Sequence, residues 1–180
     1  MSRRPATLAQ LIGRAGRDRR GAATLEFALC AAAFLALLIG ILQIALVFFV
    51  QHNIETAAES VARRVLTGQI PAGTTRDQFR TQACAALPAF LQCDRLYVDV
   101  RQVADLGSIN TVLGGLAFDA NGTVTDTTRF DPGGAGAVVV LRLIYDWPLG
   151  TLPLGLNLGN QANGSRTIVG TMVFKSEPYA

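Results

Sequence analysis

The sequence is poor in the side chains that most catalytic and metal sites require. Its 180 residues include one histidine, His52, and three cysteines. His52 lies two residues after a long apolar run that ends at Val50, so it cannot serve a Ser-His-Asp triad in the residues farther along the chain. No glycine-rich phosphate loop follows a predicted strand, and no pair of carboxylates stands out from the loops. The sequence therefore predicts no catalytic residues, no cofactor and a protein that is not an enzyme.

Positive charge is concentrated at one end of the chain. The formal net charge is +3, yet six of the 16 basic residues are arginines that precede Ala22, where the only acid is Asp18. Elsewhere the basic residues are scattered, and only Arg63 and Arg64 are adjacent. A nucleic-acid-binding protein gathers basic residues on one face instead. The charge thus indicates membrane topology, and we predict no nucleic-acid partner.

The longest feature of the sequence is an apolar run. Between Phe27 and Val50 the only strongly polar side chain is Gln43. As a helix this run is roughly 36 Å long, enough to cross the hydrocarbon core of a lipid bilayer. A helix of a soluble core is rarely apolar on every face. We predict a transmembrane helix over residues 22–50, with the arginine-rich flank in the cytoplasm and the residues after Gln51 outside it.

The junction before this run differs from that of a secretory signal, which has its small residues after the apolar region. Here Gly21 and Ala22 precede it. Cleavage between them would leave an apolar helix with a free amine, in which Glu26 is the fifth residue. A carboxylate at that depth is costly without a positive partner, and a neighbouring subunit's N-terminal ammonium is the natural one. The alternative is a basic flank that is never removed.

The segment GAATLEF, which begins at Gly21, resembles the prepilin processing site of type IV pilin-like proteins. The chain as a whole is similar to the Tad-type minor pseudopilins, the TadE-like family. The resemblance rests on RRGAATLEFAL, QHNIETAAESVAR, the later cysteine pair and the closing VFKSEPY. It covers most of residues 19–180 and is weakest over 104–136. Phe27 stands where related major pilins usually carry Tyr, which, like the length of the chain, favours a minor subunit.

The resemblance implies a minor pseudopilin of a Tad-type, type IV-like pilus or secretion machine. It divides the chain into a cytoplasmic basic leader (1–21), the transmembrane helix (22–50) and an extracytoplasmic TadE-like head (51–180). A prepilin peptidase, an aspartic protease, would cut after Gly21. The other expected partners are minor pseudopilins, the pilus platform, the major pilin and the lipid bilayer.

The expected role is structural, in pilus assembly and surface adhesion. The protein would lie in the bacterial inner membrane with its head periplasmic or extracellular. The alternative is an uncleaved bitopic membrane protein that presents a periplasmic binding module. Glu26 discriminates between the two, because an uncleaved anchor has no evident use for an acid at membrane depth.

The long helix is predicted to continue beyond the membrane to about residue 67. Apolar residues recur there at helical spacing, and Gly68 and Pro71 follow as C-terminal signals. The members of this stripe are Ile54, Ala57, Ala58, Val61, Ala62 and Val65.

Thr75 and Gln78 form a capping-box pattern that opens a second helix, which Pro88 shortens or kinks. Its expected apolar face comprises Phe79, Ala83, Ala86, Leu87 and Phe90.

Cys84 and Cys93 flank the end of the second helix. Outside the cytoplasm a disulfide between them is chemically permitted, and it would close a short loop. The alternative, a metal site, lacks nearby ligands because His52 is the only histidine. Cys30 lies inside the apolar run and is interpreted as a small packing residue.

Three strands are predicted over residues 95–103, 137–147 and 165–175. The first alternates Leu96, Val98 and Val100 with outward-facing Tyr97, Asp99 and Arg101, which is typical of a half-buried strand. The second is a nearly continuous apolar run, typical of a central strand. The fold class is therefore α+β, with a small antiparallel sheet packed on the long helix.

Two connections remain open to more than one interpretation. Residues 119–126, DANGTVTD, invite a calcium site, but Gly122 is misplaced for an EF-hand loop, and a hairpin turn at Asn121 and Gly122 is favoured. Residues 149–160, LGTLPLGLNLGN, are rich in leucine. Exposed, they would suit a partner or the membrane surface; buried, they would cover one end of the sheet.

Overall fold

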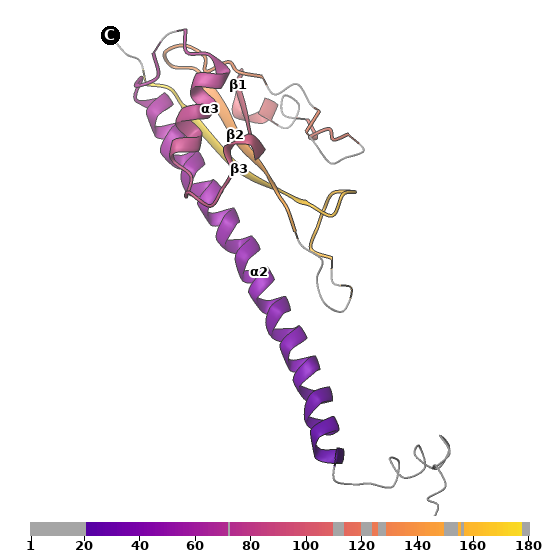
Figure 1. The fold of residues 1–180 in the computed structure, drawn as a ribbon. Helices are drawn as coiled ribbons and strands as arrows, with labels where there is room; N and C mark the ends of the chain where they lie inside the picture. Colours follow the sequence, from indigo (N-terminus) through magenta and orange to yellow (C-terminus); the bar gives the residue numbers. More distant parts are fainter. Residues whose placement is uncertain are drawn as a thin grey trace, which may run out of the picture. The chain divides into compact units, whose positions relative to one another are not determined.

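The computed structural model describes residues 21–71, 73–109, 114–119, 124–125, 129–149, 155 and 157–177. The chain divides into two compact units, residues 1–42 and 43–180, with the boundary inside helix α2. The fold class is α+β, as predicted, with two α-helices and one three-stranded antiparallel sheet among the described residues (Figure 1). Residues 1–20 of the predicted leader lie outside this description.

Helix α2 runs from Ala22 to Leu66 without interruption. Its most apolar 18-residue window has a mean hydropathy of 2.8, and by length and composition the helix could cross a membrane. Its large apolar side chains before Val50 are mostly exposed, as lipid-facing side chains would be. Those above one-half exposure are Leu25, Phe27, Leu29, Phe34, Leu35, Leu37, Ile41, Leu42, Phe48 and Phe49. The helix fits a single-pass membrane protein.

The second half of α2 supplies one wall of the core. The predicted apolar stripe is buried along its whole length, and Val50 extends it toward the membrane-spanning run. Each member is at most 7 % exposed: Val50, Ile54, Ala57, Ala58, Val61, Ala62 and Val65. The helix ends where Gly68 adopts a φ of 68°, a left-handed conformation that glycine allows without strain. The predicted helix and its termination signal are confirmed.

The sheet has the order β1-β2-β3, with β1 at Leu96–Val103, β2 at Val138–Trp147 and β3 at Arg166–Lys175. Both pairs are antiparallel, and Leu143 of the central strand lies opposite Val98 and Gly170. The three predicted strands are thus confirmed, including the central place of the most apolar one. The strand side chains that belong to the same hydrophobic core as α2 and α3 are Leu96, Val98, Val100, Val139, Leu141, Leu143, Tyr145 and Ile168.

Strand β3 runs in the same direction as α2, and the two backbones approach closely. Gln51 Nε2 donates to the Val169 carbonyl at 3.3 Å, and the Glu177 N–H donates to the Leu66 carbonyl at 3.3 Å. Between these contacts, a Cβ on Gly170 would lie 2.9 Å from the Ile54 carbonyl oxygen. Only glycine allows this approach without a shift of one backbone.

The outer edge of β1 is covered by a segment for which no strand was predicted. The Val100 N–H donates to the Arg129 carbonyl at 2.8 Å, and the Asp131 N–H donates to the Val100 carbonyl at 2.9 Å. Phe130, between them, places its ring 5.1 Å from that of Phe79. The end of the connection 104–136 is therefore part of the core.

Helix α3, Arg76–Ala85, begins with the predicted capping box of Thr75 and Gln78. Phe79 and Ala83 are buried, but the helix ends before Pro88. The prediction that Phe90 belongs to the buried face was wrong, because Phe90 lies beyond the helix and is 50 % exposed. The residue before a proline is disfavoured in a helix, which explains the early end.

The two open connections are described only in part. Asn121 and Gly122 lie outside the described residues; Phe118 and Val124, on either side of them, form an antiparallel bridge. Within the described part of the chain, no group of three or more His, Cys, Asp or Glu could hold a metal ion. Of the leucines in 149–160, Leu149 and Leu158 are described, and both are partly buried.

Candidate functional site

The structure places the predicted processing junction at the start of α2. Gly21 immediately precedes the helix, and Ala22 is its first residue. Both are exposed, and a Cβ on Gly21 would meet nothing within 4 Å. On the side of α2, where the structure describes the chain, access to this junction is therefore sterically open.

Glu26 lies one turn after Ala22, about 6 Å farther along the helix axis. It is exposed, and it is the only charged residue between Ala22 and Val50. The apolar residues that surround it in sequence offer no cation. In a bilayer this carboxylate would require a positive partner from outside its own stretch of helix.

The head contains a buried ion pair that the sequence reasoning missed. Asp99 was expected on the outward face of its strand, yet it is 1 % exposed. Arg142 lies opposite it on β2, and its Nε donates to Asp99 Oδ2 at 2.9 Å, with Nη2 also bonded to that oxygen. Arg101 Nε and the Arg129 N–H donate to Asp99 Oδ1 at 2.8 and 2.9 Å.

The hydrogen-bond donors around Asp99 keep its carboxyl group ionised. Burial by itself would raise the pKa of Asp99, but the hydrogen bonds from Arg101, Arg142 and the backbone of Arg129 hold it below the ordinary 3.8. The carboxylate is charged and its oxygens are occupied by protein donors. The cluster therefore joins β1, β2 and residues 129–131, which cover the edge of β1. It leaves little room for a substrate.

The disulfide loop is tied to the central strand of the sheet. Cys84 of α3 and Cys93 form a disulfide, with Cα atoms 5.6 Å apart. Next to it, the Tyr145 hydroxyl accepts a hydrogen bond from the Gln92 N–H at 2.9 Å. Burial raises the pKa of Tyr145 above its ordinary 10.0. The third cysteine, Cys30, is free and exposed on α2.

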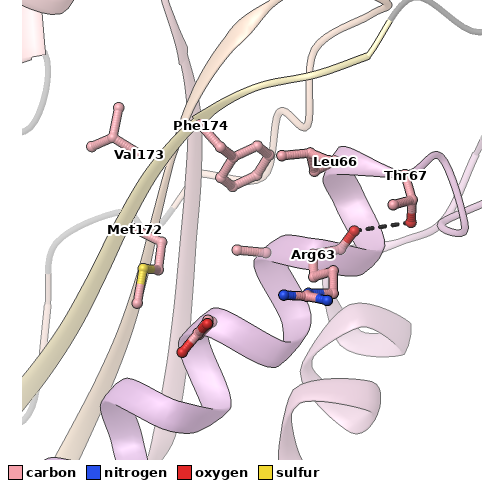
Figure 2. Close-up of a pocket in the computed structure, with 8 residues that line it drawn as sticks. Arg63, Leu66, Thr67, Met172, Val173 and Phe174 are labelled. Atoms are coloured by element: carbon pink, nitrogen blue, oxygen red, sulfur yellow. Dashed lines mark hydrogen bonds between the residues drawn. The ribbon is translucent and has the colours of Figure 1, made fainter.

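A groove of about 350 Å³ lies between α2 and β3. Figure 2 shows that Phe174 and Leu66 point toward each other across it, while Val173 points away from the helix. At its end, Thr67 Oγ1 donates to the Arg63 carbonyl at 2.9 Å. The full lining is Glu59, Ala62, Arg63, Leu66, Thr67, Met172, Val173 and Phe174. These mostly apolar side chains suit packing and include no histidine, cysteine or serine nucleophile.

The structure thus keeps the predicted site residues in two separate places. Gly21, Ala22 and Glu26 lie at the beginning of α2, whereas Cys84 and Cys93 lie in the head. Of the missed residues Asp99 and Arg142, only Arg142 carried a signal in the sequence, because it is a charge within the apolar run 138–145 of β2.

Over residues 21–63 the chain matches the family model described as TadE-like protein. No curated protein and no solved structure matches the chain. The matched segment begins at the predicted junction and includes Glu26, the apolar run and most of the buried stripe. The match confirms the resemblance to the TadE-like family over this segment.

Proposed function

We propose that this chain is a minor pseudopilin of a Tad-type pilus or a related secretion machine, with a structural role in pilus assembly and surface adhesion. The observation that carries the proposal is the coincidence of Gly21, Ala22 and Glu26 at the start of one long apolar helix. This arrangement lies wholly within the segment that matches the TadE-like family. A prepilin peptidase would cut between Gly21 and Ala22.

Cleavage there would create an electrostatic requirement that Glu26 can meet. The new ammonium would sit at the N-terminus of α2, where the helix dipole is also positive. An acid of a neighbouring helix would offset both. In staggered packing, Glu26 of one subunit would contact the Ala22 amine of the next. This single ion pair would offset the cost of placing a carboxylate and an ammonium in the membrane. It would also set the axial offset between neighbouring helices.

The rest of the chain supports a structural role. Asp99 and Arg142, the buried charged residues in the described part of the head, are engaged with each other. Its groove is mainly apolar. Such a head offers surfaces for other minor pseudopilins, the pilus platform and the major pilin. We propose that it is not an enzyme and that it works from the inner membrane with the head outside the cytoplasm.

A second candidate is an uncleaved bitopic protein that presents a periplasmic binding module. The groove between α2 and β3 favours it, because an open apolar groove can accept a ligand or a peptide. It gives Glu26 no role, however, and it does not need a junction of small residues before the helix.

The two candidates differ in what Glu26→Gln does in cells that carry the complete pilus system. Under the first, assembled surface pili are lost or strongly reduced, while the amount of the protein in the membrane is unchanged. Glu55→Gln is the matched control, since Glu55 is an exposed acid of the same helix beyond the apolar run. Normal piliation in Glu26→Gln would contradict the pairing role and favour the uncleaved anchor.

A further inference from the structure

Three exposed phenylalanines gather where the apolar run of α2 meets the head. Phe48 and Phe49 are 68 % and 52 % exposed, and Phe90 is 50 % exposed. The rings of Phe49 and Phe90 stack with centroids 5.7 Å apart and an interplanar angle of 19°. A loop of the head therefore reaches the last turn of the apolar run.

That loop is apolar and firmly held. Residues 85–91 read AALPAFL, without one charged or hydrogen-bonding side chain. The disulfide of Cys84 and Cys93 closes it, the Leu91 N–H donates to the Pro88 carbonyl at 2.9 Å, and the Leu91 side chain is 4 % exposed. The exposure of Phe90 is thus built into an ordered loop.

A second connection reaches the same stretch of α2. Leu158, from the leucine-rich residues 149–160, lines a cavity of about 160 Å³ together with Ile44, Val47 and Phe48. Arg166 also lines it, and its Nη1 donates to the Leu158 carbonyl at 2.9 Å. The Arg166 guanidinium thus holds Leu158 against α2.

We propose that Phe48, Phe49, Phe90 and Leu158 form a membrane collar, a surface by which the head contacts the outer interface of the lipid bilayer. The collar is continuous with the membrane-spanning run, because Phe48 and Phe49 belong to both. Any side chain in contact with Phe49 lies at the depth where the helix leaves the hydrocarbon. Phenylalanine and leucine are typical of apolar surfaces that lie at the boundary between the lipid headgroups and the acyl chains.

The charge at the collar also fits lipid. Arg166 can keep its guanidinium at the level of the lipid phosphates while the apolar residue that it holds lies deeper. The proposal rests on the membrane-spanning assignment of α2 and not on cleavage after Gly21. It gives the head a second attachment to the bilayer, which sets how the head stands above the membrane before assembly.

Tryptophan fluorescence of the full chain in vesicles tests the collar. Trp147 is the only tryptophan, so Trp147→Phe gives a silent background into which Phe90→Trp is introduced. The matched control is Val173→Trp, which is 42 % exposed in wild type and lies beside the groove at Glu59 to Thr67, farther along α2. Leu35→Trp, within the apolar run, reports insertion of the helix.

The vesicles contain phosphatidylcholine and phosphatidylglycerol with a spin label near the top of the acyl chain. We expect Phe90→Trp to be quenched several-fold more than Val173→Trp and to be less accessible to aqueous iodide. Equal, weak lipid quenching of the two, with Leu35→Trp quenched, would overturn the collar. Protection of Phe90→Trp from iodide without lipid quenching would also overturn it and would indicate a second protein chain. An unquenched Leu35→Trp would remove the membrane span on which the collar depends.

Discussion

Asp99 of β1 and Arg142 of β2 face each other in the sheet register and form an ion pair in which the Asp99 side chain is fully buried and that of Arg142 is 7 % exposed. Arg101 and the backbone of Arg129 complete the set of donors to the carboxylate. This pair joins the central strand to the edge strand and to the segment that covers it. The head therefore depends on a charge cluster as well as on its apolar core.

Asp99→Asn should destabilise the head strongly. The substitution leaves the buried guanidinium of Arg142 without its carboxylate, and breaking a buried pair in this way costs about 3–5 kcal/mol. Chemical denaturation in detergent micelles measures the loss. The double variant Asp99→Leu/Arg142→Leu should lose less than the single one, since it removes the buried guanidinium of Arg142 together with its carboxylate, while Arg101 loses the same carboxylate in both variants. A single variant as stable as wild type would contradict the role of the pair.

The free energy of unfolding should also depend on pH through Asp99. The pKa of Asp99 is lower in the folded head than its ordinary 3.8, so its contribution is fully present above that value and is lost as the pH falls through the folded pKa. The stability difference between wild type and Asp99→Asn should therefore be constant near neutral pH and shrink below about pH 4. Denaturation midpoints along a pH series measure it. A difference that grows toward low pH would contradict the assignment.

Gly170→Ala tests the close approach of β3 and α2. The added methyl would lie 2.9 Å from the Ile54 carbonyl oxygen, so one backbone must shift, at a cost of about 1–3 kcal/mol. Gly134→Ala is the control, because a Cβ there meets nothing within 4 Å. The thermal unfolding midpoint should fall for the first variant and barely change for the second. Equal midpoints would show that the two backbones have room to separate.

Loss of the disulfide should loosen the loop that carries Phe90. The bridge closes a loop with a sequence separation of 9, for which the chain-entropy argument gives about 2–3 kcal/mol. Cys84→Ala/Cys93→Ala should unfold at lower denaturant, and amide hydrogen exchange should rise in residues 85–92. Cys30→Ala, outside the head, should change neither. A double variant with unchanged exchange would show that the non-covalent contacts of Leu91 and Gln92 hold the loop without the disulfide.

Much of the fold could be predicted because its signals are local. The spacing of Ile54, Val61 and Val65 specified the buried side of α2, and Thr75 with Gln78 specified the start of α3. The alternation of Leu96, Val98 and Val100 specified the inner face of β1. Each signal depends on residues within a few positions of one another.

The missed features depend on residues far apart in the sequence. The alternation within β1 predicts that Asp99 faces solvent. Its burial depends on the register that places Arg142 opposite it, and no local pattern predicts that register. Arg129 and Phe130 cover the edge of β1 from the end of a long connection that showed no strand periodicity. Phe90 follows the apolar spacing of α3, but the helix stops before reaching it. Only the tertiary arrangement places that ring beside Phe49.

The mature N-terminus of the protein, isolated from its native membrane, tests the central claim most directly. Intact-mass and N-terminal peptide measurement should give a chain that begins at Ala22 in cells with an active prepilin peptidase, and one that retains residues 1–21 when the peptidase is inactivated. A chain that still begins at Met1 beside an active peptidase would contradict the pseudopilin assignment. It would leave a membrane-anchored module in which Glu26 has no partner amine.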